Sequence, residues 1–298
     1  MKAWQPDRLL PGFEALELEF PDDYDGRVLA TLVRPPAGAA PRGAVLWVHG
    51  FNDYFFQRHV AERFAMEGYA FYAIDLRKHG RSLRPHQHAN FCKSLAEYYP
   101  DITRAIDAIG EPVLLAGHST GGLLAALYAH DGPHRERVRA LWLNSPFFDW
   151  RLPDWRRAQM HLAAAVGRFF PFLNDPRALL PDYTQALLDQ GWEFDAALKP
   201  VPGFPVYYGW LGAIADAQAK VHRGLDLRTP VLAMHSDEAD VVLDWRHIAR
   251  WSRTLGPEVT VLAFPGAMHD LTLSRPEIRE EVFRQLFSWA ERAVMSPA

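Results

Sequence analysis

One short segment of this 298-residue sequence has the residue types and spacing of a covalent nucleophile. Residues 117–121 read Gly-His-Ser-Thr-Gly, with an apolar run before them and small residues after them. Such a motif fits a sharp turn from a strand into a helix, because flanking glycines leave that turn free of clashing side chains. The helix N-terminus beside Ser119 would favour a developing negative charge. We therefore predict that Ser119 is a nucleophile.

A serine hydroxyl is a weak nucleophile at neutral pH and needs an imidazole to take its proton. On this kind of turn the partners follow in the chain order serine, acid, histidine. The last of thirteen histidines, His269, comes just after the final apolar run and is the predicted base. The acid should follow the preceding strand, where Asp237 and Asp240 compete. The residues alone leave that choice open.

The attacked carbonyl becomes an oxyanion, which needs two preorganised backbone N–H donors. One is expected from Thr120, the residue after the nucleophile. The other is expected from the loop after the first buried strand, where Gly50 lets the chain turn back toward the serine. We assign that second donor to the N–H of Phe51.

Short apolar runs alternate with segments of helical periodicity along most of the chain. The runs are typical of strands that are buried on both faces. The predicted strands are Glu14–Phe20, Arg27–Arg34, Ala44–Val48, Tyr69–Leu76, Pro112–Gly117, Val138–Asn144, Pro230–His235 and Glu258–Phe264. The predicted helices are Gln57–Glu67, Lys93–Ile109, Gly122–His130, Asp244–Leu255 and Glu277–Val294. The first two strands should form a hairpin, and the rest predicts an α/β fold, a mostly parallel central sheet with helices on both faces.

One region, from Pro146 to about Arg228, interrupts this alternation with helical pieces, prolines and many aromatic residues. We interpret residues 146–228 as an inserted helical cap, and residues 1–145 with 229–298 as the core domain. The aromatic residues should mainly pack the cap onto the core, while some of them line an apolar pocket. They include Trp150, Trp155, Phe169, Phe170, Phe172, Trp192, Phe194, Phe204, Tyr207, Tyr208 and Trp210.

Composition narrows the functional classes further. The chain is 49% hydrophobic and 23% charged, as folded enzymes are, and its net charge of -4 does not suggest a nucleic-acid partner. Residues 1–10 lack the apolar stretch of a secretory signal, and no run approaches the roughly 18–20 apolar residues of a membrane span. We expect a cytoplasmic protein, with peripheral contact to a membrane left open.

Neither a metal nor a cofactor is expected. The single cysteine, Cys92, has no partner for an intrachain disulfide or a thiolate metal site. The loop that holds His79, His86 and His88 has no nearby carboxylates at helical spacing, so it does not form a persuasive metal site.

Five motifs resemble the monoacylglycerol lipase and lysophospholipase branch of the α/β-hydrolases, also called serine aminopeptidase-like. They are His49-Gly50, Asp75-Leu76-Arg77-Lys78-His79-Gly80-Arg81-Ser82, Gly117-His118-Ser119-Thr120-Gly121-Gly122, Pro230-Val231-Leu232 leading to Asp240-Val241-Val242, and Gly266-Ala267-Met268-His269. The resemblance covers most of the chain outside residues 146–228 and implies the α/β-hydrolase fold.

In that branch the acid is typically an aspartate followed by a Val-Val pair ahead of a helix, which favours Asp240 over Asp237. Two positions depart from the branch. Thr120 stands where methionine is usual, and Lys78 stands where glycine is common. Because the backbone N–H of residue 120 does the work, the first departure costs little.

Together these features predict a cofactor-independent serine hydrolase. It would cleave small carboxylic esters with a hydrophobic acyl group, such as a monoacylglycerol or a lysophospholipid, through an acyl-enzyme. Two alternatives stay open: amide, peptide or thioester hydrolysis on the same scaffold, and a non-catalytic binding protein. An exopeptidase needs carboxylates in the cap to hold a free amine, and the candidates are Asp149, Asp154, Asp182, Asp189, Glu193 and Asp195.

Overall fold

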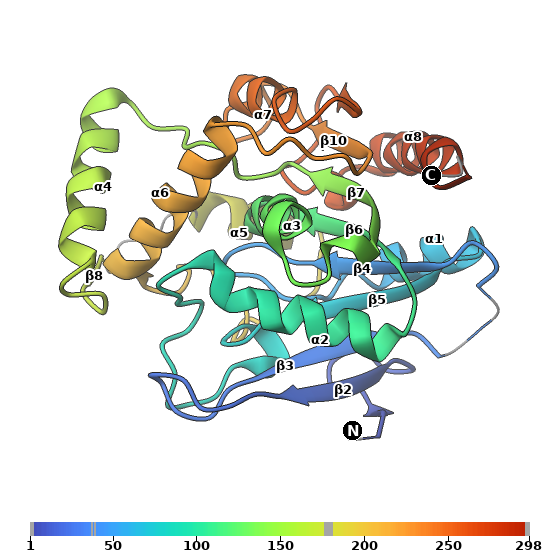
Figure 1. The fold of residues 1–298 in the computed structure, drawn as a ribbon, viewed down its shortest axis with the longest axis horizontal. Helices are drawn as coiled ribbons and strands as arrows, with labels where there is room; N and C mark the ends of the chain where they lie inside the picture. The colour runs from blue at the N-terminus through green and yellow to red at the C-terminus, as the bar shows by residue number, and fades with distance from the viewer. Residues whose placement is uncertain (1–2, 37, 39, 176–180, 296–298) are drawn as a thin grey trace.

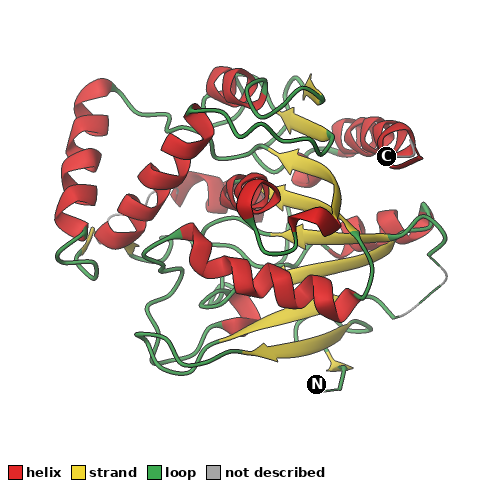
Figure 2. Ribbon diagram, viewed as in Figure 1, coloured by secondary structure: helices red, strands yellow, loops and turns green. Residues whose placement is uncertain are grey.

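A mostly parallel sheet forms the centre of the molecule in the computed structural model, which describes residues 3–36, 38, 40–175 and 181–295 (Figure 2). Its strands in chain order are β1 Gln5–Pro6, β2 Glu14–Glu19, β3 Leu29–Arg34, β4 Ala44–Val48, β5 Ala70–Asp75, β6 Val113–His118, β7 Val138–Asn144, β10 Val231–His235 and β11 Val259–Ala263. Among the described residues the order across the sheet is β1-β2-β3-β5-β4-β6-β7-β10-β11. The neighbours from β5 to β11 are parallel, and β1, β2 and β3 join antiparallel.

Two apolar cores cover the two faces of the sheet. The helices that cover it are α1 Arg58–Met66, α2 Tyr99–Ile109, α3 Thr120–Asp131, α7 Trp245–Ser252 and α8 Pro276–Met295. On β4, Leu46 and Val48 belong to the core under α2 and α3, whereas Val45 and Trp47 belong to the core under α1 and α8 (Figure 1). This alternation explains why the strands read as continuous apolar runs. The predicted α/β-hydrolase fold is confirmed.

One predicted helix begins later than the sequence indicates. Instead of a helix over Lys93–Ile109, the chain forms a 3-10 turn at Leu95–Tyr98, and α2 starts at Tyr99. The reason is Pro100, which has no N–H to donate and would clash with the carbonyl four residues earlier in an α-helix. The strand β1 was not predicted, because two residues carry no periodic signal.

Residues 146–228 join β7 to β10, which are neighbours in the sheet. This segment holds α4 Asp154–Gly167, β8 Asn174–Asp175, α5 Pro181–Asp189, β9 Val206–Tyr207 and α6 Tyr208–His222. Figure 1 shows α4 and α6 beyond the ends of the central strands. The two helices pack closely at Gly167, where a Cβ would lie 2.3 Å from the carbonyl oxygen of Tyr208. The antiparallel pair of β8 and β9 was missed because two-residue strands leave no apolar run.

The aromatic residues of this segment do not all pack against the core. Trp155, Phe169 and Phe170 are 59%, 81% and 63% exposed, so the expectation of packing is wrong for these three. Within the described ranges, no helix has both the length and the apolar character needed to cross a bilayer.

A buried arginine fixes the loop that follows β4. The guanidinium of Arg81 donates to Asp7 at 2.7 Å, to Asp75 at 2.9 Å and to the carbonyl of Phe55 at 2.8 Å. Asp75 also accepts the N–H of Phe55 at 2.8 Å. Burial alone would raise the pKa of Asp7, but its bonds to Arg81 and to backbone N–H groups hold that pKa below the ordinary value. Arg81 therefore ties the N-terminal segment and the loop after β4 to the end of β5.

Replacing this arginine should destabilise the fold. We expect Arg81→Ala to lower the free energy of unfolding by about 3–5 kcal/mol, because Asp7 and Asp75 are left with uncompensated buried charge. Urea unfolding followed by tryptophan fluorescence measures the effect. The matched control is Arg27→Ala, whose ion pair with Glu19 is exposed and should contribute less than about 1 kcal/mol. Equal losses in the two variants would contradict a structural role for the buried ion pairs.

Candidate active site

Ser119 stands on a strained turn between β6 and α3, with φ 53° and ψ -116°. A Cβ on Gly117 would lie 2.3 Å from the carbonyl oxygen of Gly121. A Cβ on Gly121 would lie 2.3 Å from the carbonyl oxygens of Val48 and His49. No side chain fits at either position, so the two glycines permit the left-handed backbone of the serine between them.

His269, in the loop after β11, bonds to a buried carboxylate. Its Nδ1 lies 2.9 Å from Oδ2 of Asp240, and both side chains are almost fully buried. The other oxygen of Asp240 accepts the N–H groups of Val242 at 2.7 Å and Leu243 at 3.0 Å. Burial alone would raise the pKa of Asp240, but the nearby imidazole and these N–H groups lower it below the ordinary value. The ionised carboxylate can therefore hold the imidazole in one orientation.

The competing aspartate lies elsewhere. Oδ1 of Asp237 accepts the N–H of Ala239 at 3.1 Å and that of Gly266 at 3.0 Å. Asp237 thus ties the loop after β10 to the loop after β11. Of the two aspartates, the structure brings Asp240 to the imidazole of His269.

The second imidazole nitrogen borders the cavity that holds the serine. Ser119 and His269 both line a cavity of about 330 Å³. Nε2 of His269 is buried and has no hydrogen-bond partner among the described residues, Ser119 included. With Nδ1 donating to Asp240, Nε2 keeps a lone pair. A base that is not hydrogen-bonded to its nucleophile is common before a substrate binds.

The two predicted oxyanion donors line the same cavity. In the part of the chain that the structure describes, neither the N–H of Phe51 nor that of Thr120 has an acceptor. A Cβ on Gly50 would lie 3.2 Å from the Cβ of Ser119, so the loop after β4 passes directly beside the serine. Both N–H groups are thus available to a charge that develops there.

Two side chains that carry no recognisable motif, Asn52 and Asp53, connect this loop to residues 146–228. Asn52 donates to the carbonyl of Pro200 at 3.2 Å and accepts the N–H of Phe204 at 3.2 Å. Lys199 pairs with Asp53 at 2.8 Å, and each side chain is only 5% exposed. These partners are 146 to 152 residues apart, so no local pattern could have revealed them.

A second missed group anchors the loop that carries His269. The buried carboxylate of Asp270 accepts from the amide of Asn144 at 2.7 Å and from the hydroxyl of Thr272 at 2.7 Å. The side chain of Gln57 adds a bond at 3.2 Å. These bonds hold the end of the loop, directly after His269, against the end of β7 and so help to position His269.

The cavity wall over the serine is largely apolar, and half of its residues come from residues 146–228. Phe147, Trp150 and Trp210 line it, and the ring of Phe51 packs 4.2 Å from that of Trp210, centroid to centroid. Of the aromatic residues that the sequence analysis named, Trp150, Phe204 and Trp210 reach the cavity.

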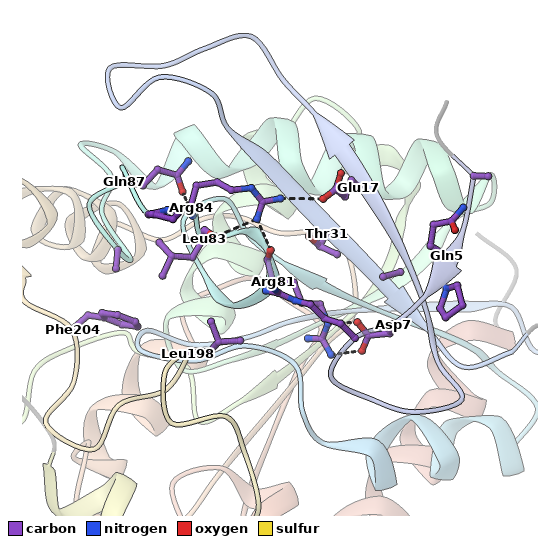
Figure 3. A pocket seen from close by; sticks show the side chains of 16 residues that line it. Gln5, Asp7, Glu17, Thr31, Arg81, Leu83, Arg84, Gln87, Leu198 and Phe204 are labelled. Atoms are coloured by element: carbon purple, nitrogen blue, oxygen red, sulfur yellow. Dashed lines mark hydrogen bonds and ion pairs between the residues drawn. The ribbon is translucent and has the colours of Figure 1, made fainter.

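A larger hollow of about 890 Å³ lies between the N-terminal segment and residues 83–89 (Figure 3). Two of its three arginines are already engaged, since Arg84 bonds to Glu17 at 3.0 Å and Arg81 to Asp7 at 2.7 Å. None of the predicted catalytic residues lines it. The cavity at Ser119 is therefore the candidate active site.

Known proteins with similar sequences and folds agree with the predicted resemblance. Over 261 residues the chain is 24% identical to a monoacylglycerol lipase of Mycolicibacterium smegmatis, covering 84% of this chain and 88% of the relative. It is 21% identical to the monoglyceride lipase of Saccharomyces cerevisiae, covering 95% of each.

Two solved structures share the fold. A soluble variant of the Saccharomyces cerevisiae monoglyceride lipase, bound to a substrate analog, superposes with a TM-score of 0.74 at 18% identity, covering 93% of this chain and 97% of the other. The monoacylglycerol lipase of Paleococcus ferrophilus gives a TM-score of 0.67 at 24% identity, covering 88% and 99%. Residues 39–275 match the family model described as serine aminopeptidase, S33. The chain therefore belongs to the serine aminopeptidase S33 family of α/β-hydrolases.

Proposed function

We propose that this protein is a serine hydrolase that cleaves carboxylic esters with a hydrophobic acyl group. Ser119 is the nucleophile, His269 the general base and Asp240 the acid that orients it. The observation that carries the proposal is the buried bond between Asp240 and His269, beside the cavity that also contains the strained turn of Ser119. The relatives named monoacylglycerol lipase and monoglyceride lipase support an ester as the bond that is cleaved.

The reaction proceeds in two halves. In the first, Oγ of Ser119 bonds to the ester carbonyl carbon while Nε2 of His269 takes the hydroxyl proton. The carbonyl oxygen becomes an oxyanion that accepts from the N–H groups of Phe51 and Thr120. The bond to the alcohol then breaks, and His269 gives its proton to the leaving alkoxide.

The second half releases the acyl group. Water gives a proton to Nε2 of His269, and its oxygen bonds to the acyl carbon. The bond to Oγ of Ser119 then breaks, and the serine takes the proton back as the carboxylic acid leaves. Asp240 stabilises the imidazolium in both halves without being protonated itself.

Residues 146–228 act in this proposal as a cap over a core of residues 1–145 and 229–298. The apolar wall that this segment contributes supports a medium or long acyl chain, as in a monoacylglycerol or a lysophospholipid. A cytoplasmic location and contact with a membrane surface stay predictions.

The charges around the cavity favour an ester over an aminopeptidase substrate. An exopeptidase needs an unpaired carboxylate for the free amine, and none of the five candidate acids whose side chains the structure describes lines the cavity. Asp149 pairs with Arg157, and the side chain of Asp182 lies outside the described residues. Asp53 does line the cavity, but its charge is neutralised by Lys199.

Removing the nucleophile should abolish activity. On p-nitrophenyl esters of increasing chain length, we expect Ser119→Ala to lower kcat by about 10⁴-fold or more, because no other group replaces the attacking oxygen. A fluorophosphonate probe should label the wild type and leave the variant unlabelled.

The control is Ser288→Ala, on the far side of the sheet in α8, which should keep full activity. Equal hydrolysis by wild type and Ser119→Ala would end the assignment. A wild type that neither reacts with the probe nor hydrolyses esters would point to a binding protein. Faster turnover of prolyl amides or thioesters than of esters would support amide or thioester hydrolysis as the main reaction.

The two aspartates after β10 form a matched pair for testing the acid. Asp240→Asn should lower kcat by about 10⁴-fold, because the amide no longer holds the imidazole in the productive tautomer. Asp237→Asn should lower kcat only slightly, since that side chain bonds to loop N–H groups. A larger loss of kcat in Asp237→Asn than in Asp240→Asn would show that Asp237 is the acid that orients His269.

The same variant gives a pH test of stability. Because the pKa of Asp240 lies below its ordinary value of 3.8, its ionised form stabilises the fold above about that pH. This stabilisation is lost as the pH falls through the lowered pKa. The difference in unfolding free energy between wild type and Asp240→Asn should therefore be present at pH 7 and shrink below pH ~4, as measured by urea unfolding. A difference that grows in acid would contradict this.

A further inference from the structure

Two arginines lie at the mouth of the Ser119 cavity. Arg151 and Arg156 both line it and are exposed, as is Val241. His269, which lines the same cavity, is only 3% exposed. The cavity thus runs from a buried reactive end to a mouth that carries two guanidinium groups.

Neither guanidinium is neutralised by a carboxylate in the described part of the chain. Arg151 donates to the backbone carbonyl of Asp240, and the guanidinium of Arg156 lies over the ring of Trp155. The next residue, Arg157, behaves differently and forms an ion pair with Asp149. Arg151 and Arg156 therefore keep hydrogen-bond donors that no carboxylate of the described residues occupies.

The remaining charges of the cavity wall cancel. Lys199 and Asp53 form a buried ion pair at 2.8 Å, which leaves the two arginines as cavity-lining cations that form no ion pair among the described side chains. A substrate with a free amine would be repelled by this field. An anionic group would be attracted, and the apolar wall below the mouth would hold a hydrocarbon chain.

We propose that Arg151 and Arg156 form an anion site that selects esters with a carboxylate or phosphate at the end away from the scissile bond. A guanidinium binds either group through paired N–H donors. The site rests on the proposed ester hydrolysis at Ser119 and determines which esters are preferred. The anion can belong to the acyl part or to the alcohol part of the substrate.

Two pairs of esters distinguish these sources. The first pair compares the mono-p-nitrophenyl ester of octanedioic acid with p-nitrophenyl octanoate, which lacks the terminal carboxylate. The second compares 1-dodecanoylglycerol 3-phosphate with 1-dodecanoylglycerol. For each pair, the ratio of kcat/KM for the anionic ester to that for the neutral ester is measured in wild type and in variants.

Arg156→Gln should lower that ratio about tenfold in the pair of esters whose anion lies on the same side as in the natural substrate. The double variant Arg151→Gln with Arg156→Gln should lower the ratio further. The loss should lie mainly in KM, because the anion contact is the same in the ground state and the transition state. Higher salt should lower the wild-type ratio as well. The control is Arg168→Gln at the other end of α4, exposed and outside the cavity, which should leave the ratio unchanged.

The outcomes separate this site from the reaction itself. A fall in one pair supports the anion site and identifies its source. Unchanged ratios in both pairs for the double variant overturn the anion site, while hydrolysis that depends on Ser119 would still stand.

If the wild type cleaves none of the four esters, the proposed hydrolysis fails instead. Calorimetric binding of the anionic esters to Ser119→Ala, with and without Arg156→Gln, then decides the anion site without turnover. Equal affinities in the two proteins would overturn it.

Discussion

The turn at Ser119 has no room for a side chain on either flanking glycine, and the rest of the site is arranged around that constraint. Gly121 packs against the last carbonyls of β4 so closely that the loop after β4 passes beside the serine. Phe51 and Thr120, whose N–H groups are the proposed oxyanion donors, both line the cavity beside the serine. The parallel order of β6, β7, β10 and β11 then delivers the loops with Asp240 and His269 to the same edge.

The groups proposed for the reaction and those proposed for selectivity come from different parts of the chain. Asn144 and Asp270 fix the loop of His269 from within the sheet, and Arg81 fixes the loop after β4. The two arginines at the mouth and part of the apolar wall come from residues 146–228. Changes in that segment can therefore alter the accepted substrate while the reacting groups stay in place.

The sequence predicted the features that depend on neighbouring residues in the chain, namely the turn at Ser119 and the buried strands. The glycines around Ser119 and the apolar strands were visible because each follows from its own neighbours. Contacts between distant residues left no such signal. The pairing of Lys199 with Asp53 is one example, and the choice of Asp240 over Asp237 needed the resemblance to a family. Lys78 is another: it adopts φ 64° where the branch commonly has glycine, is fully buried, and pairs with Asp23 and Asp25 at 2.9 Å each.

The bonds of Asn52 have a consequence for how the molecule can move. The side chain of Asn52 bonds to the backbone of Pro200 and Phe204. Asn52 is also the residue directly after Phe51, whose N–H is a proposed oxyanion donor. Residues 200–204 cannot swing outward without breaking two hydrogen bonds beside that donor. The loop that carries the proposed oxyanion donor is thus coupled to residues 200–204, so a substitution at either distant segment can disturb the other.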